Sequence, residues 1–301
     1  MKTAGEIAIV DELRRMASTR ARSGLALGIG DDCAVFRPRA GEELLFTTDL
    51  LLEDVHFRRA THSPEAVGHK ALARGLSDIA AMGGAPRFCL VSLAAPADRP
   101  WIRRFYRGLL RLAGETGTSL AGGDLARAGR VACDIVVCGA VPRGTALRRD
   151  GARAGHEIWV SGLLGASALG LAEGKGRAFR RHLRPEPRLR LGAFLRQRLR
   201  ATAAMDLSDG LSLDLHRMCL ASRLAAEIEA PPLFPGAALA QALHGGEDYE
   251  LLFTLRPGTR VPAAFEGIPL ARIGRMRRGA PGEVLLEGRP LPPGGWDHFR
   301  P

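Results

Sequence analysis

The chain has 301 residues, 46% of them hydrophobic, which is enough for one large or two ordinary domains with a substantial core. It has no run of 18 apolar residues, no signal-peptide pattern and no CxxC pair among its five cysteines. We therefore expect no membrane span, no zinc site and no disulfide framework, and a cytoplasmic location. The net charge of +11 comes from widely spread arginines with few aromatic residues between them. This pattern favours a solvated basic surface that attracts small anionic substrates over a nucleic-acid-binding surface.

The first half of the chain is predicted to alternate helices and strands. Residues 1–22 have the spacing of an amphipathic helix, and an acidic loop follows. A strand is expected over 43–49 and a long helix over 63–82, which has Pro64 in its first turn and ends at Gly83-Gly84. The remaining elements of this half are a strand over 88–94, a helix over 100–116, a turn at 122–124 and a strand over 131–141.

The second half begins after a stretch rich in Gly, Arg and Pro, residues 142–155, which we take as the domain boundary. We place the two domains at residues 1–144 and 145–301. The elements expected after the boundary are strands over 157–162, 225–228 and 247–254 and helices over 165–171 and 188–200. This alternation indicates an α/β (α+β) fold.

Carboxylates recur beside glycine turns or at the ends of the predicted elements. In the first example, Gly28-Ile29-Gly30 is followed directly by Asp31-Asp32, so a tight turn holds two like charges side by side. Oxygen ligands from Asp, Ser and Thr suit Mg²⁺, and no cluster of His and Cys accompanies them that would suit zinc. The whole set comprises Asp31, Asp32, Asp49, Asp78, Asp124, Asp206 and Asp209.

Each acidic motif also has a purely local explanation. The Asp31-Asp32 pair is consistent with a solvated loop, and Ser208-Asp209-Gly210 is consistent with a helix N-cap. It is the recurrence of such motifs in one chain that favours a shared role. If the acids gather, several Mg²⁺ ions that bridge a polyphosphate would balance their charge.

Several common nucleotide and hydrolase motifs are absent from the sequence. There is no GxxxxGK[ST], no GxGxxG and no GxSxG. A nucleotide phosphate would therefore be bound by metal ions and backbone N–H groups. Phosphoryl transfer mainly requires alignment and charge neutralisation, which such a site supplies.

Seven motifs together resemble the thiamine-monophosphate kinase family, which belongs to the aminoimidazole ribonucleotide synthetase superfamily. The resemblance extends from about Gly28 to Phe299, and LSDIAAMG, GGEDYEL and the terminal GWDHF are its most specific parts. In chain order the motifs are GIGDDCAV, TTDLLLEDVHF, KALARGLSDIAAMGGAP, GGD, MDLSDGLSLDLH, GGEDYELLFT and GWDHF.

The resemblance implies a two-domain fold and a direct phosphoryl transfer. The N-terminal domain would bind Mg²⁺ and ATP and form a homodimer interface, and the C-terminal domain would complete the nucleotide and substrate site. The enzyme would transfer the γ-phosphoryl group of ATP in line to thiamine monophosphate, giving thiamine diphosphate, with several Mg²⁺ ions. The resemblance implies neither a nucleic-acid nor a membrane partner.

The resemblance also implies roles for individual residues. The catalytic residues would be Asp49, Asp124 and Asp209. ATP would contact Tyr106, Gly123, Arg149 and Ser208, and thiamine monophosphate would contact His56, Glu247 and Trp296, whose ring can stack on a cationic thiazolium. The Mg²⁺ ligands would be Asp32, Thr47, Thr48, Asp49, Asp78, Asp124, Asp206 and Asp209. The chain departs from the family pattern at Gly75, where Asn is frequent, and at Leu125, where Thr is frequent.

Two alternatives stay open from the sequence. The first is another ATP-using enzyme of the same superfamily, of the cyclo-ligase or selenophosphate synthetase type. The second is a basic nucleic-acid-binding protein without ATP turnover, whose binding would weaken steeply with salt.

Overall fold

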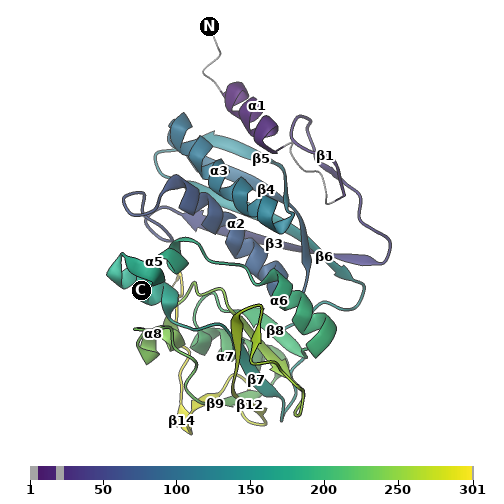
Figure 1. The fold of residues 1–301 in the computed structure, drawn as a ribbon, viewed down its shortest axis with the longest axis vertical. Coiled ribbons are helices and arrows are strands. Elements are labelled where there is room, and N and C mark those ends of the chain that lie inside the picture. Colours follow the sequence, from purple (N-terminus) through teal and green to yellow (C-terminus); the bar gives the residue numbers. More distant parts are fainter. Residues whose placement is uncertain (1–5, 18–23, 300–301) are drawn as a thin grey trace. The chain divides into compact units, whose positions relative to one another are not determined.

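The computed structural model describes residues 6–17 and 24–299, and they form two compact units (Figure 1). Within the described residues, the first unit comprises the chain up to Ile79 together with Gly84–Gly144. The second comprises Ala80–Gly83 and the chain from Thr145 onward. Each unit has its own sheet and its own helices, so the predicted α/β class is confirmed. No helix in the described ranges is both long and apolar enough to cross a bilayer.

The first unit is built on a four-stranded sheet in the order β3-β6-β4-β5. Only β4 and β5 are parallel to each other; the other two pairings are antiparallel. The strands are β1 (Leu25–Leu27), β2 (Val35–Phe36), β3 (Glu42–Leu52), β4 (Ala85–Ala95), β5 (Ser119–Arg127) and β6 (Ala132–Pro142), and the helices are α1 (Glu6–Ala17), α2 (Pro64–Ala81) and α3 (Arg99–Thr116).

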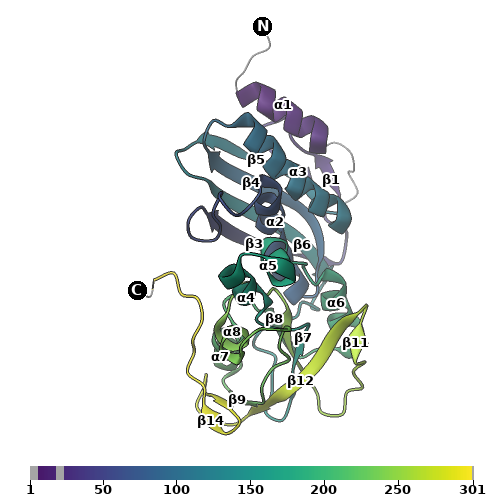
Figure 2. The same ribbon diagram turned by 60° about the vertical axis from the view of Figure 1, so that its left-hand side comes forward.

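The two faces of this sheet differ sharply. Helices α2 and α3 lie over one face of the sheet (Figure 2). Successive strand residues point to opposite faces, and the face toward these helices carries buried residues such as Leu45, Val91 and Ile135. On the other face, Phe46 and Leu50 of β3 are 64% and 50% exposed. The β1–β2 hairpin contributes to this second face, where the rings of Phe36 and Phe88 lie 5.1 Å apart. The first unit therefore has one covered face and one largely open face.

The predicted turn at residues 122–124 is wrong, because these residues lie inside β5. The pairing of β5 with β4 shifts register between Cys89 and Leu90, as at a β-bulge. Gly123 has φ of 149°, and a Cβ atom at this position would meet the Val91 carbonyl oxygen at 1.9 Å. Only glycine lets the two backbones approach so closely, so the glycine signal marks a bulged strand.

The second unit contains the larger sheet, in the order β14-β13-β9-β12-β7-β10-β8, with β11 beside β12. Apolar clusters that include Leu215 and Phe253 pack against it. The strands are β7 (Glu157–Ser161), β8 (Ala203–Asp206), β9 (Ala225–Ile228), β10 (Leu251–Leu255), β11 (Ala264–Phe265), β12 (Ile268–Arg277), β13 (Val284–Leu286) and β14 (Arg289–Pro290), and the helices are α4 (Ala166–Glu173), α5 (Gly176–Leu183), α6 (Leu189–Phe194), α7 (Leu211–Ser222) and α8 (Leu239–His244).

Most predicted elements are confirmed within a few residues, and three need comment. The predicted helix over 1–22 is helical over Glu6–Ala17, while residues 1–5 and 18–22 lie outside the described ranges. The predicted helix over 188–200 divides into α6 and a π-helical turn, Leu195–Leu199. The predicted strand over 247–254 begins only at Leu251, because Glu247 and Tyr249 have positive φ angles of 66° and 50°.

Candidate active site

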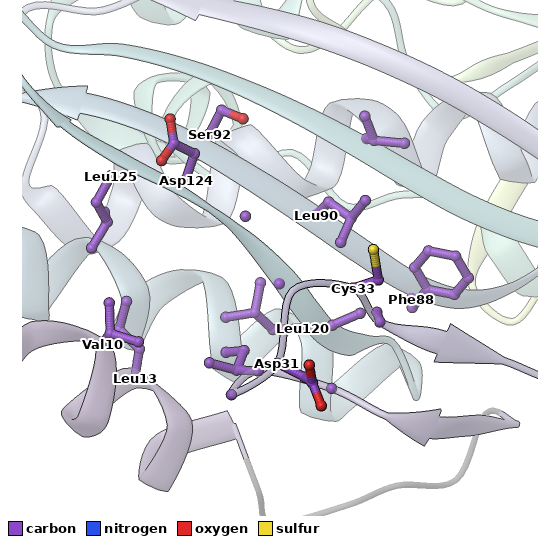
Figure 3. A pocket seen from close by; sticks show the side chains of 18 of the residues that line it. Val10, Leu13, Asp31, Cys33, Phe88, Leu90, Ser92, Leu120, Asp124 and Leu125 are labelled. Carbon is purple, nitrogen blue, oxygen red and sulfur yellow. The ribbon is translucent and has the colours of Figure 1, made fainter. Parts of the chain in front are cut away.

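A cleft of about 700 Å³ lies in the first unit, between α1, the acidic loop and the open face of the sheet (Figure 3). Asp31 and Asp32 line it from the loop, and Ser92, Gly123 and Asp124 line it from β4 and β5. Ser92 and Asp124 are paired in the parallel register of these two strands. The cleft has the size of an ordinary small-molecule site.

The charge of this cleft is negative. Asp31, Asp32 and Asp124 are all exposed to solvent, and none of the described residues that line the cleft is Lys or Arg. A polyphosphate would be repelled by these carboxylates unless cations lay between them. The donor set, carboxylates with a hydroxyl, fits hard cations such as Mg²⁺.

A carboxylate that the motifs did not single out lies on the same face of the sheet. Asp134 of β6 is paired with Ser92 of β4, which is paired in turn with Asp124 of β5. Thr48 donates a hydrogen bond of 2.6 Å to Asp134 Oδ1. The available signal was a single acid that interrupts the apolar run VACDIVVCG.

The neighbouring predicted ligands point to the opposite face, toward α2. Thr47 donates a short hydrogen bond to Asp78 of α2. Asp49 forms an ion pair of 3.1 Å with Arg74, whose Nη1 also donates to the Leu50 carbonyl. The structure thus brings together Thr47 with Asp78, but it separates them from Thr48, because alternate residues of β3 face opposite ways.

Two further predicted residues in this unit are held in place by the fold. His56, in the loop after β3, accepts a hydrogen bond of 3.0 Å from the Leu52 N–H at Nδ1, and Lys70 donates to its carbonyl at 3.3 Å. Tyr106 lines the cleft from α3 and is only 3% exposed. Burial raises the pKa of Tyr106, with a smaller contribution from nearby groups that include Asp124, so the phenol stays a neutral donor.

In the second unit, the loop that carries Ser208 and Asp209 is fixed from α7. The buried Asp214 carboxylate accepts hydrogen bonds from the N–H groups of Asp209 and Gly210, at 3.0 and 3.1 Å. Arg217 contacts the carboxylates of both Asp209 and Asp214. Burial raises the pKa of Asp214 to about 6, although its backbone hydrogen bonds lower it. The sequence motif contained Asp214, but its role required the fold.

Other predicted residues of the second unit lie along the same loop. The N–H of Trp296 donates to the Asp209 carbonyl at 3.1 Å, and the N–H of Glu247 donates to the Ser208 carbonyl at 2.7 Å. A Cβ atom at Gly295 would meet the Asp209 carbonyl oxygen at 2.4 Å, so the C-terminal segment needs glycine there. The Trp296 side chain is 51% exposed. Four predicted residues are therefore brought together by backbone contacts.

The last two predicted residues, Asp206 and Arg149, lie at different distances along the chain from the Ser208-Asp209 loop. Asp206 ends β8 and is 3% exposed, one residue before the Ser208 loop begins. Arg149 is exposed, and its carbonyl accepts a hydrogen bond of 2.8 Å from Ser222 Oγ at the end of α7. Asp206 is therefore close in sequence to the Ser208-Asp209 loop. The backbone of Arg149 instead contacts the C-terminal end of α7, the helix that follows this loop.

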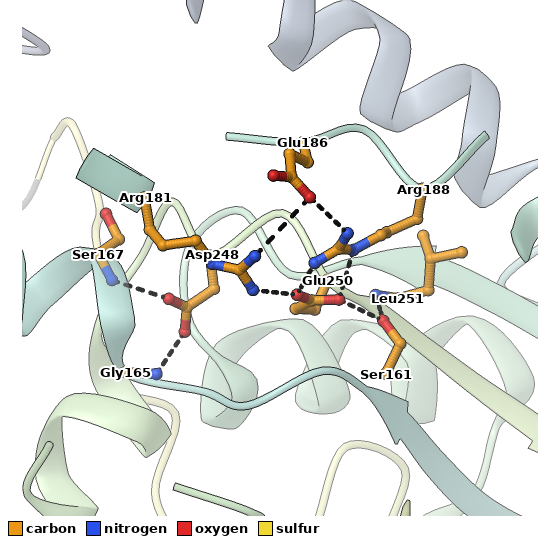
Figure 4. Close-up of polar contacts among 9 residues, drawn as sticks. All are labelled: Ser161, Gly165, Ser167, Arg181, Glu186, Arg188, Asp248, Glu250 and Leu251. Atoms are coloured by element: carbon orange, nitrogen blue, oxygen red, sulfur yellow. Dashed lines mark hydrogen bonds and ion pairs between the residues drawn. The ribbon is translucent and has the colours of Figure 1, made fainter. Parts of the chain in front are cut away.

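The segment Gly245–Glu250 carries three carboxylates, and each is bound by a different partner; Figure 4 shows two of them, Asp248 and Glu250. Glu247 lies 3.4 Å from Nδ1 of His182. Asp248 accepts hydrogen bonds from the N–H groups of Gly165 and Ser167 at the start of α4, and burial raises its pKa to about 6. Glu250 is 1% exposed and accepts bonds from several side chains. These contacts explain why the segment departs from the predicted strand.

Metal binding in either unit would need ligands beyond the carboxylates. Within residues 6–17 and 24–299, no group of three or more His, Cys, Asp or Glu side chains is arranged to hold an ion. Protein-bound Mg²⁺ commonly uses one or two carboxylates and completes its shell with water and substrate phosphates.

Comparisons with known proteins agree with this architecture. The AIR synthase related protein, N-terminal domain family matches residues 30–144. A thiamine-monophosphate kinase of Salmonella typhimurium is 37% identical over 307 aligned positions, which cover 92% of this chain and 93% of the relative.

Two solved structures are also similar. The crystal structure of thiamine-monophosphate kinase from Stenotrophomonas maltophilia K279a has a TM-score of 0.85 and 36% identity, covering 95% of this chain and 98% of the other. The structure of AaThiL complexed with AMPPCP and TMP has a TM-score of 0.79 and 32% identity, covering 99% and 98%. Since the similarity extends over nearly the whole of both chains in sequence and in structure, this chain belongs to the thiamine-monophosphate kinase family.

Proposed function

We propose that this protein transfers the γ-phosphoryl group of ATP to thiamine monophosphate, giving thiamine diphosphate and ADP. The observation that carries the proposal is the carboxylate-lined cleft of the first unit, where Asp124 lies beside Ser92 and no described lining residue is basic. A phosphate-binding site of this sign needs cations from outside the protein. A related structure contains AMPPCP and TMP, which supports ATP and thiamine monophosphate as the two substrates.

Magnesium would be held in the first unit by Asp32 and Asp124 from the cleft, with Thr48, and by Thr47, Asp49 and Asp78 toward α2. Bound there, Mg²⁺ would neutralise the phosphate charge and align the transferred group. Thr47 and Thr48 donate their hydroxyl protons to Asp78 and Asp134, so their lone pairs are free to face a cation. In the second unit, Asp206 and Asp209 would supply further ligands.

ATP would be contacted by Tyr106, Gly123, Arg149 and Ser208. Gly123 lines the cleft, and because it has no side chain a phosphate group can approach the backbone there closely. The buried Tyr106 phenol remains protonated and can donate a hydrogen bond.

Thiamine monophosphate would be contacted by His56, Glu247 and Trp296. The exposed indole of Trp296 can stack on the cationic thiazolium ring. The Glu247 carboxylate is held near His182 and can attract the same cation. Both residues contact the Ser208-Asp209 loop through their backbones, which ties acceptor binding to a metal-binding loop.

Transfer would be direct, without a phosphorylated enzyme. Burial raises the pKa of the Cys89 and Cys133 thiols to about 12, so they are poor nucleophiles. Asp49 and Asp209 are paired with Arg74 and Arg217, and a carboxylate whose charge is already partly neutralised is a weaker nucleophile. Incubation with γ-labelled ATP without acceptor should leave the protein unlabelled, and a label that chases into product would refute direct transfer.

The first unit would also form a homodimer in the cytoplasm. Phe46 and Leu50 lie exposed on the open face of its sheet, and exposed apolar side chains of this kind are typical of a surface that a second subunit covers. Sedimentation of the wild type should give twice the 32.2 kDa chain mass, and Phe46→Glu should shift it toward the monomer. A wild-type monomer with full activity would refute the dimer.

The deciding experiment for the function measures ADP release in Mg²⁺ with and without thiamine monophosphate. We expect release that depends on this acceptor and yields thiamine diphosphate. Release with the substrate of a cyclo-ligase or a selenophosphate synthetase, but not with thiamine monophosphate, would favour the superfamily alternative. Salt-dependent nucleic-acid binding without ADP release would favour the nucleic-acid-binding alternative.

A further inference from the structure

Arg188 and Glu250 form a buried ion pair, and Glu250 ends the segment that carries Glu247. The Arg188 side chain is 7% exposed and its guanidinium binds both carboxylate oxygens of Glu250, with Nε at 2.8 Å from Oε2 (Figure 4). Arg181 of α5 donates to Oε1 of Glu250 at 3.1 Å, and Ser161 of β7 donates to Oε2 at 2.6 Å. Four donor contacts thus fix one carboxylate.

The two guanidinium groups are themselves linked. Glu186 lies 3.2 Å from Arg188 Nη1 and 3.8 Å from Arg181 Nη1. Burial opposes the charge of Arg188, but its contacts with Glu250 raise the pKa of Arg188 above the ordinary value. Arg188 therefore keeps its charge, and its two-point contact with Glu250 is geometrically specific, as guanidinium–carboxylate pairs are.

The backbone connects this network to the acceptor residues. Leu207 donates its N–H to the Glu250 carbonyl at 2.8 Å, and Tyr249 donates to the Leu207 carbonyl at 2.9 Å. Within the segment that precedes Glu250, Glu247 and Tyr249 have positive φ angles. Such angles are unfavourable for residues other than glycine. Such a conformation persists only when its surroundings fix it, and Glu250 is the fixed end of the segment.

We propose that Arg188 is a positioning residue for the acceptor site: through Glu250 it holds the Gly245–Tyr249 backbone in the conformation that aims Glu247 at thiamine monophosphate. The inference rests on the proposed function and deepens it. The Ser208-Asp209 loop has an independent support in Asp214 and Arg217, so loss of the Arg188 contact should affect the acceptor more than ATP.

The test compares Arg188→Lys, which keeps the charge but loses the two-point contact, with Arg190→Lys as control. Arg190 is two residues away, 81% exposed at its side chain, and paired with Glu266. We expect Arg188→Lys to raise both the KM and the directly measured Kd for thiamine monophosphate about tenfold while the KM for ATP changes less than about twofold. Ser161→Ala, which removes one donor to Glu250 and little volume, should raise the acceptor KM in the same direction by a smaller factor.

Hydrogen exchange gives a second measurement that needs no substrate. Arg188→Lys should accelerate exchange of the amides of Glu247 and Tyr249, while the amides of Asp209 and Gly210 stay protected. A lower melting temperature with unchanged acceptor Kd and unchanged exchange would overturn the positioning role and leave a structural one. If Arg188→Lys fails to fold, Ser161→Ala decides by the same two measurements. A wild type that does not turn over thiamine monophosphate would refute the proposed function, and the exchange result would still test the hold on the segment.

Discussion

The two units differ in the environment of their carboxylates. In the first unit, Asp31, Asp32 and Asp124 line an open cleft without Lys or Arg among the described lining residues. In the second unit, Asp214 and Glu250 are almost wholly buried and are bound by Arg217, Arg188 and backbone N–H groups. The three cleft carboxylates of the first unit are thus exposed to solvent, whereas Asp214 and Glu250 of the second unit are neutralised within the fold.

This difference separates two jobs that carboxylates can do. An acid that a guanidinium already neutralises, in a dry environment, sets the position of the backbone around it. An exposed acid beside hydroxyls, in an open cleft, remains available to a metal ion and its phosphate ligand. Substitutions in the two units should therefore affect different measured quantities, and the expected effects below run from the largest to the smallest.

The largest effect is expected for Asp124→Asn in the first unit. Because this carboxylate faces the cleft and is exposed, its loss should lower kcat by about 10³-fold with little change in the melting temperature. Asp54→Asn is the matched control: Asp54 is an exposed acid of the same unit that forms an ion pair with Arg130, and the turnover of the variant should stay near the wild-type value. A near-normal rate for Asp124→Asn at limiting Mg²⁺ would remove this residue from the metal site.

The next effect is on stability and is expected for Glu250→Ala in the second unit. Removal of this acid leaves the Arg188 charge buried, which should lower the free energy of unfolding by about 3–5 kcal/mol. Glu186→Ala, whose side chain is 66% exposed, should cost less than about 1 kcal/mol. Urea unfolding followed by tryptophan fluorescence measures both. Equal small losses in the two variants would contradict the contrast between the units.

A smaller effect is expected for Trp296→Ala at the C-terminal segment. Loss of the ring face should weaken thiamine monophosphate binding by about 1–2 kcal/mol, a rise in its KM of about fivefold to thirtyfold, with the KM for ATP nearly constant. Trp296→Phe should recover much of the loss. Phe299→Ala, 97% exposed and three residues away, is the control. Equal damage to both KM values would instead indicate that Trp296 only attaches the C-terminal segment to α7 and its loop.

The smallest effect concerns pH and His156 in the second unit. Burial lowers the pKa of His156, with Arg153 and Arg256 adding to the shift, and its Nδ1 accepts the Arg153 N–H at 3.2 Å. An unfolded histidine titrates near ~6.5, so on acidification the unfolded chain binds the proton first. Stability should therefore fall as pH drops below that value, until the folded histidine also protonates.

The pH effect is measured as the urea midpoint at pH 7.5 and pH 5.5 for the wild type and His156→Gln. The variant should show a shallower decline over this interval, whereas His298→Gln, on the exposed C-terminal segment, should follow the wild type. A parallel decline in all three proteins would exclude His156 as a source of the acid sensitivity.

The sequence by itself determined most of the elements and the family of the protein. The helix over 64–81 follows from apolar spacing with Pro64 at its start, and the β4 and β6 strands follow from continuous apolar runs, because these signals depend on neighbours a few residues apart. The recurrence of acids beside Gly, Ser and Thr likewise indicated oxygen ligation, and the ordered motifs indicated the family that the comparisons confirmed.

Only the tertiary structure decided how those residues are grouped. The register of β3, β6, β4 and β5 places Thr48 with Asp134 and separates Thr47 to the other face, which a one-residue slip would reverse. The Arg188–Glu250 pair joins positions 62 residues apart, and the sequence around neither residue predicts which residue it pairs with. Local spacing fixes helices and strands because their contacts lie within a few residues, whereas charge pairing and strand register depend on the folding of distant segments against one another.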